Sequence, residues 1–144
     1  MIDAAAILKK FCSFLEEELN SKIEIGAEMF RPAEANFGAS VKINGKIPLV
    51  IGVLADKPTF HKLAETYAKI DIEDTAEDFD AVSELVNVFA GKLIVKIAAK
   101  CHVEENLEPP RFGKISGKIR VNKISANFGN LYLYLDGEEI FNTP

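Results

Sequence analysis

Residues 76–100, AEDFDAVSELVNVFAGKLIVKIAAK, form the stretch of sequence that decides the fold. Apolar residues recur in it at intervals of three and four, which predicts one long amphipathic helix. Acidic residues between Asp71 and Asp80 lead into its start, and three lysines stand toward its end, as the helix dipole favours. One side of the helix is apolar and is expected to be buried: Val82, Leu85, Val86, Phe89 and Leu93.

The opposite side of this helix carries polar residues and a glycine. Asp80, Glu84, Asn87 and Gly91 fall within roughly 60° of one another about the helix axis. Glycine costs about 1 kcal/mol in a helix relative to alanine, so Gly91 weakens the helix unless something must approach it closely. Because acids and amides commonly lie on solvated helix faces, this arrangement does not by itself identify a site.

Two further helices are predicted before this one. Residues 3–19 repeat apolar residues at helical spacing behind Asp3, which is a suitable N-cap. Residues 57–69 begin with Lys57-Pro58, and proline is tolerated in the first turn of a helix, where its missing N–H costs nothing.

Strands are predicted between these helices. Residues 22–30 alternate in polarity until Arg31-Pro32, because proline cannot donate to a sheet ladder. Asn44-Gly45 joins residues 38–43 and 46–54 as a hairpin, since both positions of such a turn need positive φ. The second of these strands is apolar on both faces and is expected to be central.

Two more strands are expected after the long helix and the Pro109-Pro110 break, over residues 114–121 and 131–135. The segment Ala35–Gly38 (ANFG) recurs as residues 126–129, which suggests a possible internal duplication. The whole pattern predicts an α+β fold with long helices packed on a largely antiparallel sheet.

Length and composition limit the classes of function. With 144 residues, 48% of them hydrophobic, the chain suits one domain over residues 1–144. A net charge of −5 argues against nucleic acid and anionic membranes as partners. The longest apolar run, Leu49 to Ala55, is too short to span a bilayer, and the N-terminus has no basic region typical of a secretory signal. These features favour a cytoplasmic protein.

The residues needed for most catalytic sites are scarce. Two cysteines, Cys12 and Cys101, are too few for a disulfide framework or a four-ligand zinc site. His61 and His102 have no cysteine or histidine at ligand spacing, and no nucleophile-elbow, phosphate-loop, dinucleotide or zinc-protease motif occurs. We therefore expect no metal or cofactor to be bound by this chain.

The pair Glu-x-x-Asn occurs three times, at Glu17/Asn20, Glu84/Asn87 and Glu139/Asn142, and is weak evidence alone. The wider pattern Asp80-x3-Glu84-x2-Asn87-x21-Pro109 resembles the signature of the CheC/CheX family of chemotaxis phosphatases. The other two copies are incomplete, because Lys42 replaces the proline in the first and Leu135 replaces the leading Asp or Ser in the third. The sequence from Ser83 to Gly91 is similar to that of the CheX branch of this family.

This resemblance implies that the protein hydrolyses the aspartyl phosphate of a CheY-type response regulator. It implies that Asn87 orients the attacking water and that Glu84 pairs with the regulator's lysine, with a general-base role for Glu84 left open. Asp80, Ser83 and Gly91 are expected to contact the partner. Pro109 is expected to fix the start of a strand. The regulator is expected to carry the Mg²⁺, and CheX-like relatives pair as homodimers through their sheets.

Two alternatives remain open. Ser13, Glu17 and Asn20 match the front half of the signature, so a second site on the first helix is possible, although it lacks the proline. The other alternative is a non-catalytic signalling adaptor that binds a response regulator with the same helix face.

Overall fold

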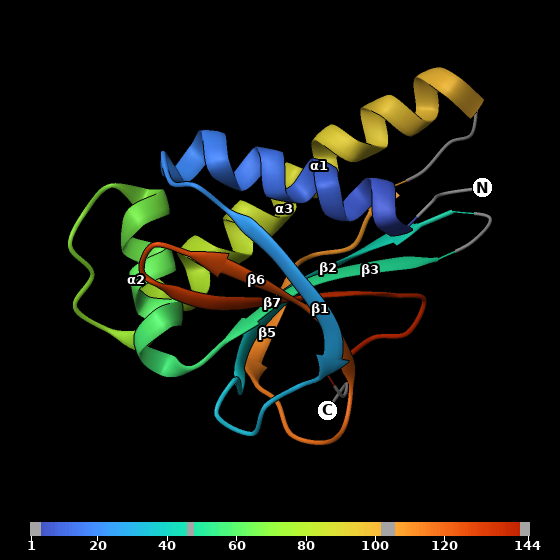
Figure 1. Ribbon diagram of the computed structural model, residues 1–144. Coiled ribbons are helices and arrows are strands. Elements are labelled where there is room, and N and C mark those ends of the chain that lie inside the picture. The colour runs from blue at the N-terminus through green and yellow to red at the C-terminus, as the bar shows by residue number, and fades with distance from the viewer. Residues whose placement is uncertain (1–3, 46–47, 102–105, 142–144) are drawn as a thin grey trace.

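The computed structural model describes residues 4–45, 48–101 and 106–141, with side chains in the long helix up to Val95. Three helices cover one face of a seven-stranded antiparallel sheet, so the predicted α+β fold is confirmed (Figure 1). Among the helices of these residues, none combines the length and the hydropathy needed to cross a bilayer.

The first half of the chain follows the prediction closely. Its elements are α1 (Ala4–Leu19), β1 (Glu24–Phe30), β2 (Phe37–Asn44), β3 (Leu49–Ala55) and α2 (Lys57–Ala68). The predicted cap Asp3 lies outside the described residues. The carboxylate of Asp56 caps α2 by accepting the backbone N–H of Thr59 at 2.8 Å.

The hairpin between β2 and β3 is longer than predicted. Ile43 pairs with Leu49, so β3 begins three residues after the predicted start at Lys46. Pro48 explains this difference, because a residue without an N–H cannot extend the ladder. The central position predicted for β3 is confirmed, since it lies between β7 and β2.

The second half contains α3 (Thr75–Cys101), β4 (Asn106–Leu107), β5 (Arg111–Lys114), β6 (Arg120–Ala126) and β7 (Gly129–Asp136). The single strand predicted over residues 114–121 is wrong. The chain leaves the sheet after Lys114 and re-enters it at Arg120, with Gly117 at φ +98° in the loop between. Only glycine adopts that conformation without strain, which ends strand pairing there.

The strand pairings repeat between the two halves of the chain. The sheet order is β1-β6-β7-β3-β2-β4, and β5 also pairs with β2. The pairing of β1 with β6 therefore corresponds to the pairing of β5 with β2. At the centre of the sheet β3 pairs with β7, which joins the two halves of the chain. The two ANFG segments run into the starts of β2 and β7, which are not equivalent strands in this arrangement. The repeat in sequence therefore does not mark the repeat in topology.

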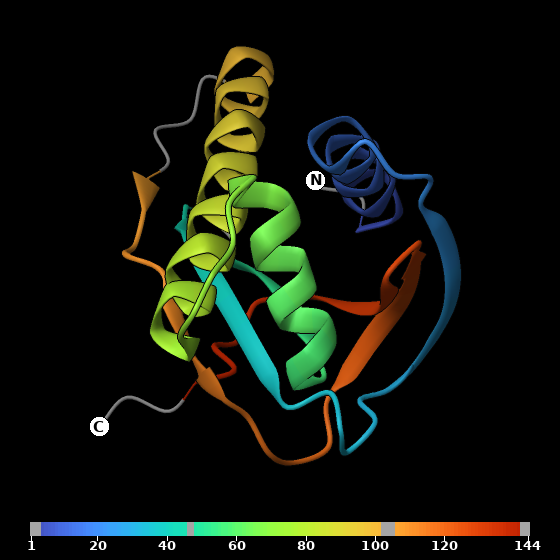
Figure 2. The same ribbon diagram turned by 90° about the vertical axis from the view of Figure 1, so that its left-hand side faces the viewer.

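The main core lies between the helices and the sheet. Its largest fully buried side chains include Phe11 of α1, Phe60 of α2 and Leu85 of α3. Figure 2 shows α1 and α3 above the sheet, with α2 between them at one end. Cys12 belongs to this core, as expected, and burial followed by the charge of Glu16 raises the pKa of its thiol to about 11.

A second, smaller core covers the opposite face of the sheet. Residues after β7 pack there, and Ile140 and Phe141 contact its buried side chains. The hydroxyl of Ser40 donates to Glu139 Oε1 at 3.0 Å, and Arg111 Nε lies 3.7 Å from Glu139 Oε2. The C-terminal segment is thereby fixed across β2.

Candidate functional site

The candidate site lies on α3, whose start is fixed by its own sequence. Asp74 Oδ1 accepts the backbone N–H of Glu77 at 2.8 Å, which satisfies a donor that the helix leaves free. Glu77 and Asp78 add negative charge to the first turn, where the helix dipole favours it.

The two predicted sides of α3 are both present in the structure. Asp80 and Glu84 are exposed, and Asn87 and Gly91 are half-buried. A Cβ placed on Gly91 would meet no atom within 4 Å, so space is open above the helix there. The apolar side is buried as predicted, at Val82, Leu85, Val86, Phe89 and Leu93.

Ser83 does not share this accessible face. It is 7% exposed, and its Oγ has no hydrogen-bond partner among the described residues. One residue along a helix is a turn of about 100° about the axis, which carries Ser83 away from the direction of Glu84 and toward the core. The expectation that Ser83 contacts a partner directly does not fit its burial.

A cluster of polar side chains joins α2 to the first turn of α3. His61 Nδ1 lies 2.8 Å from Oδ1 and 3.0 Å from Oδ2 of the buried Asp78, while His61 Nε2 lies 3.2 Å from Glu65 Oε1. Glu65 Oε2 also accepts the backbone N–H of Ile72 at 2.9 Å, in the connection between the helices. Sequence reasoning missed this cluster, because nothing in the spacing of His61 and Asp78 indicates that α2 and α3 meet there.

Tyr67 of α2 is a further neighbour of the site that the sequence did not indicate. Its phenol is half-buried, and desolvation, followed by the negative charges of Glu84 and Glu18, raises its pKa. Tyr67 is thus a protonated hydroxyl in the electrostatic neighbourhood of Glu84, between α1 and α3.

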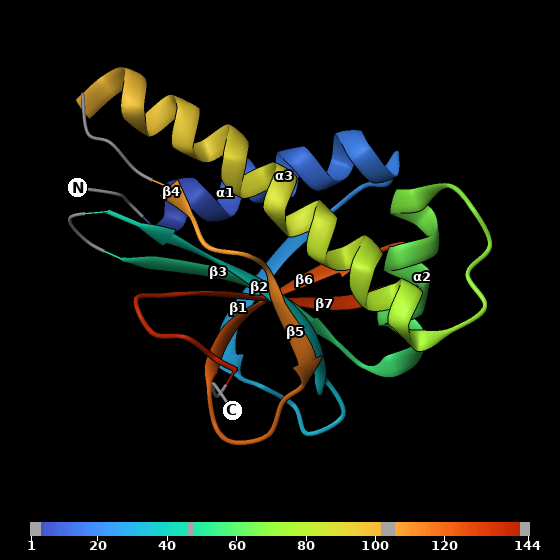
Figure 3. The ribbon, with the colours of Figure 1, turned by 180° about the vertical axis from the view of Figure 1, so that it is seen from behind.

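Pro109 lies apart from α3 in the sequence, in the short break between β4 and β5. Both strands pair with β2, so Pro109-Pro110 interrupts one edge of the sheet (Figure 3). The backbone N–H of Glu108 donates to the carbonyl of Lys42 at 2.9 Å immediately before the break. This position suits a residue that sets where β5 begins.

The possible second site on α1 has different geometry. Ser13 and Glu17 are exposed on α1, but Asn20 follows the last residue of the helix and has a φ of +49°. Its amide therefore does not lie on the helix face in the way that Asn87 does on α3. Among the described residues, no three His, Cys, Asp or Glu side chains are grouped so that they could hold a metal ion.

No protein-family model and no curated protein sequence matches the chain, whereas several solved structures do. The CheX chemotaxis protein of Desulfovibrio desulfuricans has a TM-score of 0.71 at 18% identity, over 94% of this chain and 98% of that one. CheX from Borrelia burgdorferi, solved as a complex with CheY, BeF3 and Mg²⁺, has a TM-score of 0.71 at 21% identity, over 94% and 99%.

A CheC-like protein from Shewanella sp. PV-4 also has a TM-score of 0.71, at 14% identity over 93% of this chain and 97% of that one. These likenesses show that the chain has the fold of CheX and CheC-like chemotaxis proteins.

Proposed function

We propose that this protein is a cytoplasmic phosphatase that hydrolyses the aspartyl phosphate of a CheY-type response regulator in chemotaxis or related two-component signalling. One observation carries the proposal. The pattern Asp80-x3-Glu84-x2-Asn87-x21-Pro109 occurs on a chain with the CheX fold, and its polar residues lie on the accessible side of α3. The Borrelia structure of CheX together with CheY supports a CheY-type protein as the partner.

In this proposal Asn87 orients the attacking water. A carboxamide donates and accepts hydrogen bonds at once, so it can hold a water in line with the phosphorus. Positioning supplies most of the catalysis in phosphoryl transfer. A hundredfold acceleration needs about 2.7 kcal/mol, which is within the range of one well-placed amide. Asn87 is half-buried, so its carboxamide is accessible from a helix that is held firmly by the core.

Glu84 lies one turn before Asn87 and docks the regulator through a lysine. A loose transition state requires little early proton removal, so docking explains Glu84 better than a general-base role. Asp80 extends the same acidic face by one more turn, and the open space at Gly91 lets the partner approach α3 closely. The regulator supplies the Mg²⁺, so this chain needs no cofactor of its own.

The proposal is tested by phosphate release from a phosphorylated CheY-type regulator of the same organism. Asn87→Ala is expected to lower the rate about a hundredfold, with regulator binding retained. Asn127→Ala, an exposed asparagine in the β6–β7 turn, is the matched control and is expected to keep full activity. Full activity of Asn87→Ala would contradict the assignment.

The same assay separates the phosphatase from the non-catalytic adaptor. If the unmodified protein binds the phosphorylated regulator but leaves its rate of phosphate release unchanged, the adaptor function is correct and the phosphatase proposal fails.

A further inference from the structure

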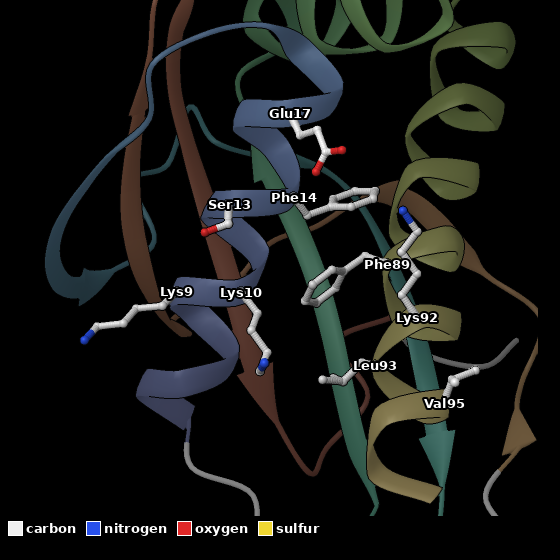
Figure 4. Close-up of a pocket in the computed structure, with 9 residues that line it drawn as sticks. All are labelled: Lys9, Lys10, Ser13, Phe14, Glu17, Phe89, Lys92, Leu93 and Val95. Atoms are coloured by element: carbon white, nitrogen blue, oxygen red, sulfur yellow. The ribbon is translucent and has the colours of Figure 1, made fainter. Parts of the chain in front are cut away.

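A groove lies between α1 and α3, at the end of the helical layer away from α2. Its volume is about 690 Å³, and we call it the α1–α3 groove. Its floor is apolar, with the rings of Phe14 and Phe89 5.4 Å apart between centroids and Leu93 beside them (Figure 4). Val95 stands at its rim and is 68% exposed, the most exposed large hydrophobic side chain in the described part of the chain.

The place of this groove in the fold indicates the shape of its occupant. The strand pairings relate the two halves of the chain, so that α1 corresponds to α3 and β3 to β7. A helix follows β3 and fills the space between α1 and α3 at one end, whereas the chain after β7 crosses to the other face of the sheet (Figures 1 and 2). The α1–α3 groove is therefore the position that corresponds to α2, and among the described residues no helix fills it.

The way α2 is held shows which side chains fit such a position. Its core contacts come from Phe60, Leu63, Ala64 and Tyr67, at spacing i, i+3, i+4 and i+7. This spacing is the stripe by which an amphipathic helix lies in an apolar groove. A volume of about 690 Å³ leaves room for several apolar side chains of that kind.

The charge of the groove indicates the residues that flank the stripe. Lys10 of α1 and Lys92 of α3 point toward the space between the helices, while Glu17 points into it near α2 (Figure 4). Lys9 borders the groove but points away from α3, so two lysines and one acid lie toward this space, although the chain as a whole has 22 acidic and 17 basic residues. The ammonium of Lys92 lies 5.2 Å from the centroid of the Phe14 ring, directly at the apolar floor.

We propose that the α1–α3 groove is a docking site for an amphipathic helix of another protein, with acidic residues flanking its apolar stripe. The helix lies between α1 and α3 as α2 does, its apolar residues contact Phe14, Phe89 and Val95, and its carboxylates face Lys92. A second copy of this chain fits less well, because α1 and α3 would bring lysines against lysines. The proposal does not depend on the phosphatase activity.

The test uses the full chain and two labelled synthetic peptides of about 14 residues, roughly four helical turns. Both carry the apolar stripe of α2, and one has glutamates at the remaining positions where the other has lysines. Fluorescence anisotropy is expected to show binding of the glutamate peptide that weakens as salt is raised, and binding of the lysine peptide at least about tenfold weaker.

Two surface variants locate the binding. Lys92→Glu and Val95→Asp are each expected to weaken binding of the glutamate peptide about tenfold, with unchanged circular dichroism. Lys57→Glu, at the exposed start of α2, is the matched control and is expected to leave the affinity unchanged.

Four outcomes would overturn the proposal. The first is that the glutamate peptide does not bind, and the second is that both peptides bind equally well. The third is that Lys92→Glu and Val95→Asp leave the affinity unchanged. The fourth is that the groove binds a second copy of this chain or anionic phospholipid. The last is detected if these two variants abolish self-association in light scattering, or binding to vesicles of anionic phospholipid, while the glutamate peptide does not bind.

Discussion

At Ser83 the structure buries a hydroxyl without giving it a hydrogen-bond partner among the described residues. A buried polar group left unpaired costs about 1–3 kcal/mol, and alanine also has a higher helix propensity than serine. We therefore expect Ser83→Ala to stabilise the protein by about 1 kcal/mol, which raises Tm by roughly 2–4 °C in a chain of this size. Thermal unfolding followed by circular dichroism measures this shift.

The exposed Ser116 provides the control for this prediction. Ser116→Ala in the loop before β6 is expected to leave Tm unchanged within about 1 °C, since surface substitutions are worth less than about 0.5 kcal/mol. A lower Tm for Ser83→Ala would show that the hydroxyl of Ser83 has a partner that stabilises the fold.

Glu84 is the residue that we expect to determine docking. Glu84→Gln removes its charge with little change of shape and is expected to weaken binding of the phosphorylated regulator about tenfold, while Glu84→Lys weakens it further by repulsion. Isothermal titration calorimetry measures both affinities. Glu73→Gln, an exposed acid before α3, should bind like the unmodified protein, and an equal affinity for Glu84→Gln would remove Glu84 from the interface.

The sequence predicted the surroundings of some residues of the candidate site and not those of others. Helical periodicity was enough to place Asp80, Glu84 and Asn87 on the accessible side of α3, because burial in an amphipathic helix follows its angular position. It was not enough for Ser83 or Tyr67. Their environments depend on which neighbouring elements pack against α3, and periodicity within one helix carries no information about that.

Among the elements, the turn between β6 and β7 depends on a single glycine. Gly129 has a φ of +148°, and a Cβ there would lie 2.7 Å from Thr59 Oγ1 of α2. Gly129→Ala is therefore expected to destabilise the protein by about 2–4 kcal/mol, through backbone strain and the contact with α2. Urea unfolding gives this difference as a lower midpoint.

Gly91→Ala is the matched control for Gly129→Ala. A Cβ at Gly91 meets no atom within 4 Å and the residue is helical, so alanine is expected to stabilise the protein by about 1 kcal/mol. Equal stability of the two variants would contradict the close packing of the β6–β7 turn against α2.

The strands show where element prediction fails. Residues 114–121 alternate in polarity like a strand, but the loop at Gly117 divides them between two strands that pair with different partners. Alternation reports the environment of each side chain and not the identity of the neighbouring strand, so the pattern could not reveal the division.

At the scale of the whole molecule, we propose that the protein is a homodimer joined through its sheet. The outer edge of β1 has no partner strand among the described residues, and Ile25 on this strand is 46% exposed. An unpaired edge of this length is a template for strand addition. Size-exclusion chromatography with light scattering is expected to give twice the chain mass of 15.9 kDa.

A variant of the edge tests this arrangement. Ile25→Lys places a charge on β1 and is expected to shift the protein toward monomer, while Ile70→Lys, at a still more exposed isoleucine far from β1 in the sequence, should remain dimeric. A monomeric mass for the unmodified protein would rule out the dimer.

The sequence by itself determined the helices, the buried and accessible sides of α3, and the central position of β3, because these follow from local periodicity and from the need to bury apolar residues. Only the tertiary structure decided the strand order, the contact of His61 with Asp78, the burial of the Ser83 hydroxyl and the groove between α1 and α3. Each of these depends on which elements distant in the chain lie side by side. That choice is made by the packing of the whole core, and no local pattern of residues encodes it.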